Sequence, residues 1–100
     1  MMTRYIIAAD NLTKDQADAL TNFLDQPQYG YWHWIENLWL VIGGPPAQTA
    51  KDLWREIVTS IPNIEPKTML VMRIDSPVSY WGRNDKVSWT WLRDQFRRDA

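Results

Sequence analysis

Asp10 is the acidic side chain of this sequence that is best placed for chemistry. It closes the apolar run Arg4–Asp10, which is typical of a buried strand, and the end of such a strand is where a cleft can form. Carboxylate oxygens suit Mg²⁺, so two copies of Asp10 in a dimer would fit metal-dependent hydrolysis of a phosphodiester. The alternative, which we favour, is that Asp10 and Asn11 form a turn and cap the next helix.

Other catalytic groups are scarce. His33 is the only histidine and cysteine is absent, so one chain builds neither a histidine-based metal cluster nor a thiolate site. No serine has a partner base at a recognisable spacing. Gly43-Gly44 is followed by no Lys-Ser/Thr pair, so it is a turn rather than a phosphate loop. His33, between Trp32 and Trp34, is therefore predicted to be a packed, hydrogen-bonded ring.

The composition predicts one small domain outside the membrane. The 100 residues are 45% hydrophobic and 23% charged, which is ordinary for a globular protein. No apolar run approaches the roughly 20 residues that span a bilayer, and no export signal is visible, so we expect a cytoplasmic protein. Residues 1–82 hold six basic and nine acidic side chains, whereas residues 83–100 hold five and three. This basic tail is the feature that points to nucleic acid.

Two capping boxes and two prolines delimit two helices. Thr13–Gln16 begins the first helix, whose apolar residues recur at helical spacing until Pro27. Thr49–Asp52 begins the second helix, which ends at Pro62. A third helix is predicted over about residues 85–97.

Four strands accompany these helices. The residues on either side of Glu36-Asn37 form a hairpin of two strands, 29–35 and 38–42, and further strands are predicted at 4–10 and 68–74. In the first hairpin strand, Trp32 and Trp34 share one face, and Tyr29, Tyr31, His33 and Ile35 share the other.

The order of these elements predicts an α+β fold of the ferredoxin-like βαββαβ type over residues 1–82. Right-handed crossovers place the first and third strands at the centre of a four-stranded antiparallel sheet, with both helices on one face. Residues 83–100 are then a helical extension packed on the same domain.

The open face of such a sheet needs a cover. We expect the C-terminal segment or a second copy of the chain to cover it, because exposed apolar patches usually mark protein contacts. Stacked bases are an alternative that the charges disfavour, since only Arg4 and Arg73 accompany the rings. Symmetric dimers are the commonest assembly, so we predict a homodimer. Its predicted interface residues are Tyr31, Trp32, Trp34, Trp89, Leu92 and Phe96.

Several segments resemble the SinR-like small proteins, relatives of the dimeric nuclease-like subunit of CRISPR adaptation and of VapD-type ribonucleases. They are the first strand closing in Asp10, the Trp32–Val41 hairpin, the second helix, Leu70–Ile74 and Tyr80–Gly82. The resemblance covers about residues 4–82 and implies a ferredoxin-like homodimer.

In the nuclease branch of that family, an acid at the end of the first strand takes part in metal-dependent cleavage, and Asp10 matches it. Ala9 stands where that branch has an aromatic residue, and its basic surface has no counterpart here.

Together these features favour a non-catalytic binding or regulatory module that homodimerises, with a protein partner and no cofactor. The alternative is a Mg²⁺-dependent endonuclease that acts through Asp10, as catalytic residue and metal ligand, at the dimer interface. Whether the chain is an enzyme stays open, because a phosphodiesterase generally needs several acids and a basic field, and this sequence offers one convincing acid.

Overall fold

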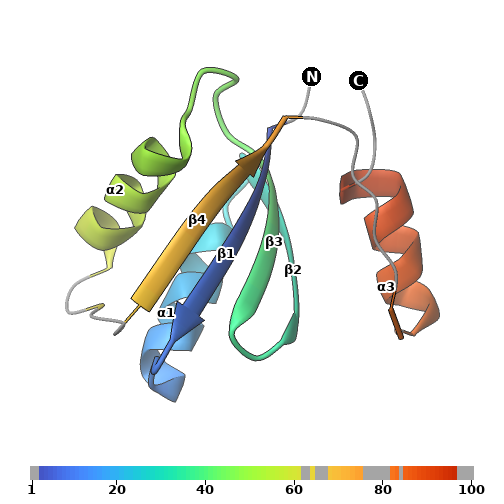
Figure 1. Ribbon diagram of the computed structural model, residues 1–100, viewed down its shortest axis with the longest axis horizontal. Helices are drawn as coiled ribbons and strands as arrows, with labels where there is room; N and C mark the ends of the chain where they lie inside the picture. Colours follow the sequence, from blue (N-terminus) through green and yellow to red (C-terminus); the bar gives the residue numbers. More distant parts are fainter. Residues whose placement is uncertain (1–2, 62–63, 65–67, 76–81, 84, 97–100) are drawn as a thin grey trace.

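Four antiparallel strands form one sheet in the order β2-β3-β1-β4 (Figure 1). The computed structural model of the protein describes residues 3–61, 64, 68–75, 82–83 and 85–96. The strands are β1 (Arg4–Asp10), β2 (Tyr29–Ile35), β3 (Leu38–Gly43) and β4 (Thr68–Ile74). The prediction of the central pair is confirmed, since β1 and β3 lie in the middle and β2 and β4 form the edges.

Both predicted capping boxes are present. They begin α1 (Lys14–Leu24) and α2 (Ala50–Ser60). The Gln16 amide donates to Thr13 Oγ1 at 3.1 Å, and the Thr13 amide donates to Gln16 Oε1 at 2.9 Å. Thr49 and Asp52 make the same reciprocal pair at 3.1 and 2.9 Å. Each box satisfies two backbone donors that a helix start leaves without a partner.

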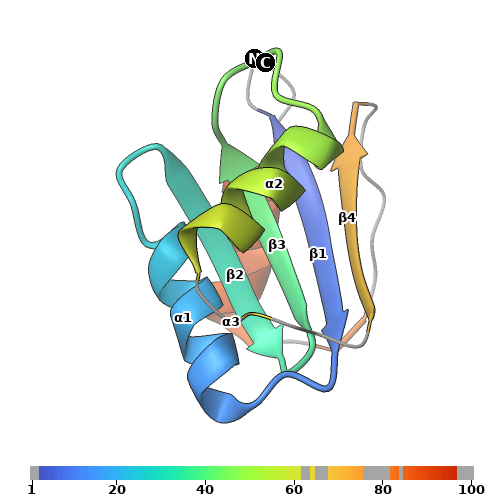
Figure 2. The same ribbon diagram turned by 90° about the vertical axis from the view of Figure 1, so that its left-hand side faces the viewer.

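α1 and α2 cover one face of the sheet, and the main core lies between them and the strands (Figure 2). Fully buried side chains from both layers fill it: Tyr5, Ile7, Leu20, Leu24, Trp39, Val41, Leu53 and Ile57. Trp39 also donates through Nε1 to Thr21 Oγ1 at 3.1 Å, so its polar atom is satisfied inside the core.

The C-terminal helix covers the opposite face, so the sheet lies between two helical layers (Figure 1). α3 (Lys86–Trp91) continues as the π-helical segment η1 (Leu92–Phe96). Leu92 and Phe96 are buried against Ile42 of β3. Arg4 of β1 is buried at the same place and donates through Nη1 to the Phe96 carbonyl at 3.2 Å. The helix predicted to reach residue 97 is thus described to Phe96.

A polar network fixes the connection between β3 and α2. Gly43 and Gly44 have φ values of 108° and 81°, which favour glycine, and a Cβ at Gly43 would collide with the Gln28 carbonyl. Downstream, the buried Tyr5 hydroxyl and Arg73 Nη1 both donate to the Gln48 carbonyl, each at 2.7 Å. The loop is therefore bonded to both β1 and β4.

No helix of the described residues is long and apolar enough to cross a membrane.

The Tyr5 hydroxyl is expected to make stability fall at high pH. Burial raises the pKa of Tyr5 from 10.0 to about 12. Between these values the folded chain holds a proton that the unfolded chain has released, so the contribution is complete below about pH 10 and is lost as pH rises through about 12. We expect a loss on the order of 2 kcal/mol from this group.

Urea unfolding from pH 9 to pH 12, comparing wild type with Tyr5→Phe, measures this loss. The mutant removes the titration of Tyr5 and leaves the other titrating groups in place. The free energy of unfolding should therefore fall more steeply with pH in wild type than in the mutant. Parallel curves would contradict the prediction.

Candidate functional site

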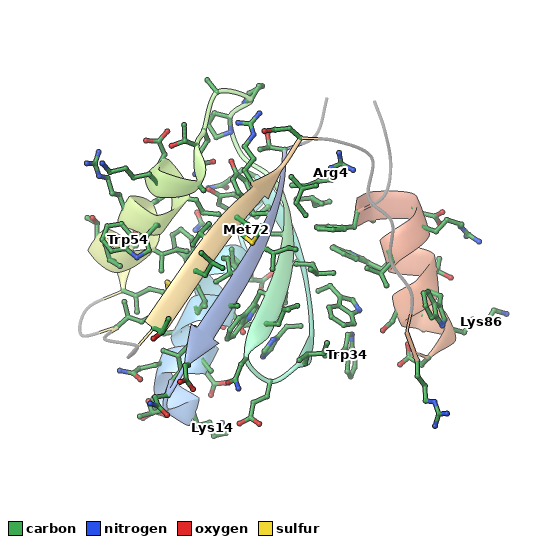
Figure 3. All side chains as sticks on the ribbon, viewed as in Figure 1. Arg4, Lys14, Trp34, Trp54, Met72 and Lys86 are labelled. Atoms are coloured by element: carbon green, nitrogen blue, oxygen red, sulfur yellow. The ribbon has the colours of Figure 1, made fainter. Side chains whose placement is uncertain are left out.

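A crevice of about 370 Å³ lies where the edge strand β2 meets α3. Residues 31–34 of β2 line it, together with Val87, Ser88 and Trp91 of α3. Thr21 of α1 also lines it. Figure 3 shows Trp34 between the end of the hairpin and α3. Three predicted interface residues, Tyr31, Trp32 and Trp34, therefore lie together in one hollow.

The crevice straddles the edge of the sheet. Successive side chains of a strand point to opposite faces, yet all four residues from Tyr31 to Trp34 line the same hollow. Thr21 belongs to the helical layer on one face and Trp91 to the layer on the other. The register of β2 against β3 also shifts between Trp32 and Ile35, which marks a bulge at this point. A group bound here would meet both faces and the strand edge between them.

His33 is held in one orientation. Its ring stacks on Trp39 with the centroids 4.0 Å apart and an interplanar angle of 4°. Its Nδ1 lies 2.9 Å from the Leu38 carbonyl, which can only accept, so Nδ1 donates the proton. The prediction of a packed, hydrogen-bonded His33 is confirmed. In the neutral ring, Nε2 remains an acceptor for a neighbouring donor.

Trp32 carries a buried donor without an acceptor. Its side chain is 5% exposed, and its Nε1 has no hydrogen-bond partner among the described residues. Leaving such a donor unpaired costs about 1–3 kcal/mol. Trp34, two residues later, is 69% exposed although it is a large apolar ring. The crevice is thus lined by a residue with a buried, unpaired donor and by an exposed aromatic ring.

The C-terminal residues that were predicted as an interface, Trp89, Leu92 and Phe96, pack against the sheet of their own chain. Leu92 and Phe96 are buried with Ile42, and Trp89 packs against this cluster. Val87 and Ser88 were not predicted as site residues. Their position depends on where α3 docks, and nothing in their local sequence indicates it.

Asp10 is exposed at the end of β1, where the predicted turn is present. Asn11 has a φ of 58°, in the left-handed region that asparagine tolerates. The prediction that Asp10 and Asn11 cap the next helix is wrong, because the predicted capping box at Thr13 begins α1. Among the described residues, no group of three or more His, Asp or Glu side chains lies together as a metal site would need. Asp10 therefore has no acidic cluster around it in one described chain.

Comparison with known proteins does not assign a family. No family model matches the chain. No curated protein and no solved structure shows a significant match to it. The resemblance to SinR-like proteins stays a prediction, and the function has to be argued from the geometry of the crevice.

The stability of α3, which lines one side of the crevice, is expected to depend on Asp85. This residue caps the helix, and its Oδ1 accepts from the Ser88 amide at 2.7 Å. Asp85→Ala should cost about 1 kcal/mol and should loosen α3 before the sheet. Hydrogen exchange followed by mass spectrometry should show faster exchange in α3, with α1 unchanged. Lys86→Ala, an exposed neighbour, is the control, and equal exchange in both mutants would contradict the assignment.

Proposed function

We propose that this protein is a small non-catalytic binding module whose crevice takes up an apolar group that carries a hydrogen-bond acceptor. The observation that carries the proposal is that Trp32 lines the crevice while its buried Nε1 has no acceptor among the described residues. An acceptor on a ligand would recover the free energy that this donor loses on burial. A bound partner thus explains a group that is otherwise unfavourable.

The rest of the crevice supports an apolar ligand. Trp34 and Val87 are 69% and 73% exposed at its rim, and Trp91 also lines it. Covering these side chains removes apolar surface from water, at about 25 cal/mol per Å². The volume of about 370 Å³ is within the range of small-ligand sites, which runs from roughly 300 to 1,000 Å³.

We also propose that the fold is of the ferredoxin-like type. Two split βαβ units joined by right-handed crossovers give the strand order β2-β3-β1-β4, with α1 and α2 on one face. The fold by itself assigns no activity, since one fold supports many functions.

The assembly that we propose is a homodimer. Leu70 and Met72 of β4 are 55% and 48% exposed. They pair with Ala8 and Ile6 of β1, and Ile6 packs in the cluster beneath α3, so the two side chains continue that apolar face beyond the helix. A second chain covering them would bury an apolar area that one chain leaves in water.

The metal-dependent nuclease remains the alternative of a different class. It would need Asp10 of two chains to share a Mg²⁺ ion, because one described chain offers no cluster of ligands. No contact of Asp10 in this structure favours it. Cleavage of RNA or DNA with Mg²⁺ or Mn²⁺, lost in Asp10→Ala, would replace our proposal with this alternative.

Binding in the crevice can be tested with N-acetyl-leucine methylamide, which combines an apolar side chain with carbonyl acceptors. Titration followed by ¹⁵N–¹H NMR should move the Trp32 indole signal downfield. Trp32→Phe should weaken binding roughly fivefold, the value of one hydrogen bond. Stability should change little, because the mutation also removes a donor that is costly to bury.

Trp54→Phe is the matched control, since Trp54 lies on α2, on the opposite side of the sheet from α3 (Figure 3). It should bind the probe as wild type does. A Trp32 indole signal that stays in place at millimolar probe would overturn the proposed site.

The dimer proposal predicts that Met72→Lys yields a monomer. In the dimer, the second chain would bury the introduced ammonium group without a counter-charge, which is unfavourable. Light scattering should give the mass of two chains for wild type and of one for the mutant. Val87→Lys, at an exposed apolar position on α3, should remain dimeric. Wild type that scatters as one chain at all concentrations would refute the dimer.

A further inference from the structure

The shape of the crevice narrows the class of partner, provided that the proposed binding function holds. β2 is an edge strand that pairs only with β3 among the described strands. We infer that the partner enters as an extended peptide and adds a strand to the free edge of β2. Three properties of the crevice support this inference: the orientation of the β2 backbone, the two-sided lining and the small volume.

The backbone of β2 presents its free groups at the crevice. The Gly44 amide donates to the Gln28 carbonyl at 3.1 Å, so Gln28 and Gly44 are a hydrogen-bonded pair. Along antiparallel strands such pairs alternate with pairs whose backbone groups point away from the partner strand. By that alternation Gly30 and Trp32 face β3, while Tyr29 and Tyr31 turn their amide and carbonyl groups outward. The Tyr29 amide indeed donates away from β3, to the Gln26 carbonyl at 3.0 Å. Tyr31 lines the crevice, so its outward groups are available to an added strand.

The lining suits side chains that alternate between two sides. An extended peptide points successive side chains to opposite faces. On one face they would meet Trp34 and Trp91, which favour an apolar residue. On the other they would meet Thr21 and His33, whose hydroxyl and Nε2 favour a small hydroxyl residue. The partner is therefore a segment in which apolar residues alternate with Thr or Ser.

The size of the crevice favours a peptide over a second copy of this chain at this edge. A stable contact between globular proteins buries about 800 Å² on each partner. A hollow of about 370 Å³, lined by Thr21 of α1 and by residues of α3, has room for a few residues. A second sheet would bring its own flanking helices against these elements.

N-methylated peptides test the strand directly. The probe is acetyl-Thr-Leu-Thr-Leu-Thr-amide, prepared unmodified, with both Leu amides methylated, and with the second and third Thr amides methylated. In an added strand only alternate amides face β2. One methylated peptide should therefore lose roughly tenfold in affinity, while the other binds within about threefold of the parent. The Tyr31 backbone amide should shift in NMR with the peptides that bind.

The outcomes separate the two proposals. If both methylated peptides bind equally and Trp32→Phe still weakens N-acetyl-leucine methylamide, the crevice binds through side chains alone and strand addition is wrong. If neither the peptides nor that small probe moves the Trp32 indole signal, the proposed function itself fails. If the Tyr31 amide gains protection from exchange as the concentration of protein rises without peptide, a second copy occupies the edge, and the peptide inference is overturned.

Discussion

The structure depends on covering both faces of a thin sheet whose strands are apolar on each side. α1 and α2 bury one face through the core around Trp39. The other face carries Ile6, Leu40, Ile42 and Ile74, and η1 covers it with Leu92 and Phe96. The hydrogen bond from the buried Arg4 to the Phe96 carbonyl joins this second layer to the central strand β1. Without that cover, the face would leave a continuous apolar surface in water.

One helix is too narrow to cover a four-stranded face, and the exposed apolar residues follow from this. α3 and η1 lie over the middle of the face, against β3. The two edges are left with exposed side chains: Trp34 on β2, and Leu70 and Met72 on β4. The edges differ in chemistry. The β2 edge adds an unpaired indole donor and a crevice, which suits a specific ligand, whereas β4 offers an apolar strip.

Our proposal of a binding module rather than an enzyme follows from the groups that the described site contains. The one histidine is committed through Nδ1 to the Leu38 carbonyl and by stacking to Trp39. Asp10 is exposed at the end of β1 and is not among the residues that line the crevice. Catalysis by acid and base needs groups within reach of a shared substrate position, and the described residues of the crevice supply rings, hydroxyls and indole donors instead.

The sequence by itself determined the elements and their order. Thr13 and Thr49 specify helix starts through partners three residues away, and Glu36-Asn37 closes a hairpin between adjacent strands. Such signals act between near neighbours, so they are visible in the chain. The β1 and β3 pairing at the centre followed from the handedness of the crossovers.

Only the tertiary structure decided which rings meet. Trp32 and Ser88 are 56 positions apart, and they line one crevice because α3 docks on β3. The absence of an acceptor for Trp32 Nε1 among the described residues is likewise a property of that docking. Leu92 and Phe96 look like an interface stripe in the sequence, which does not distinguish a second chain from the chain's own sheet. The distinction comes from long-range packing, which no local pattern encodes.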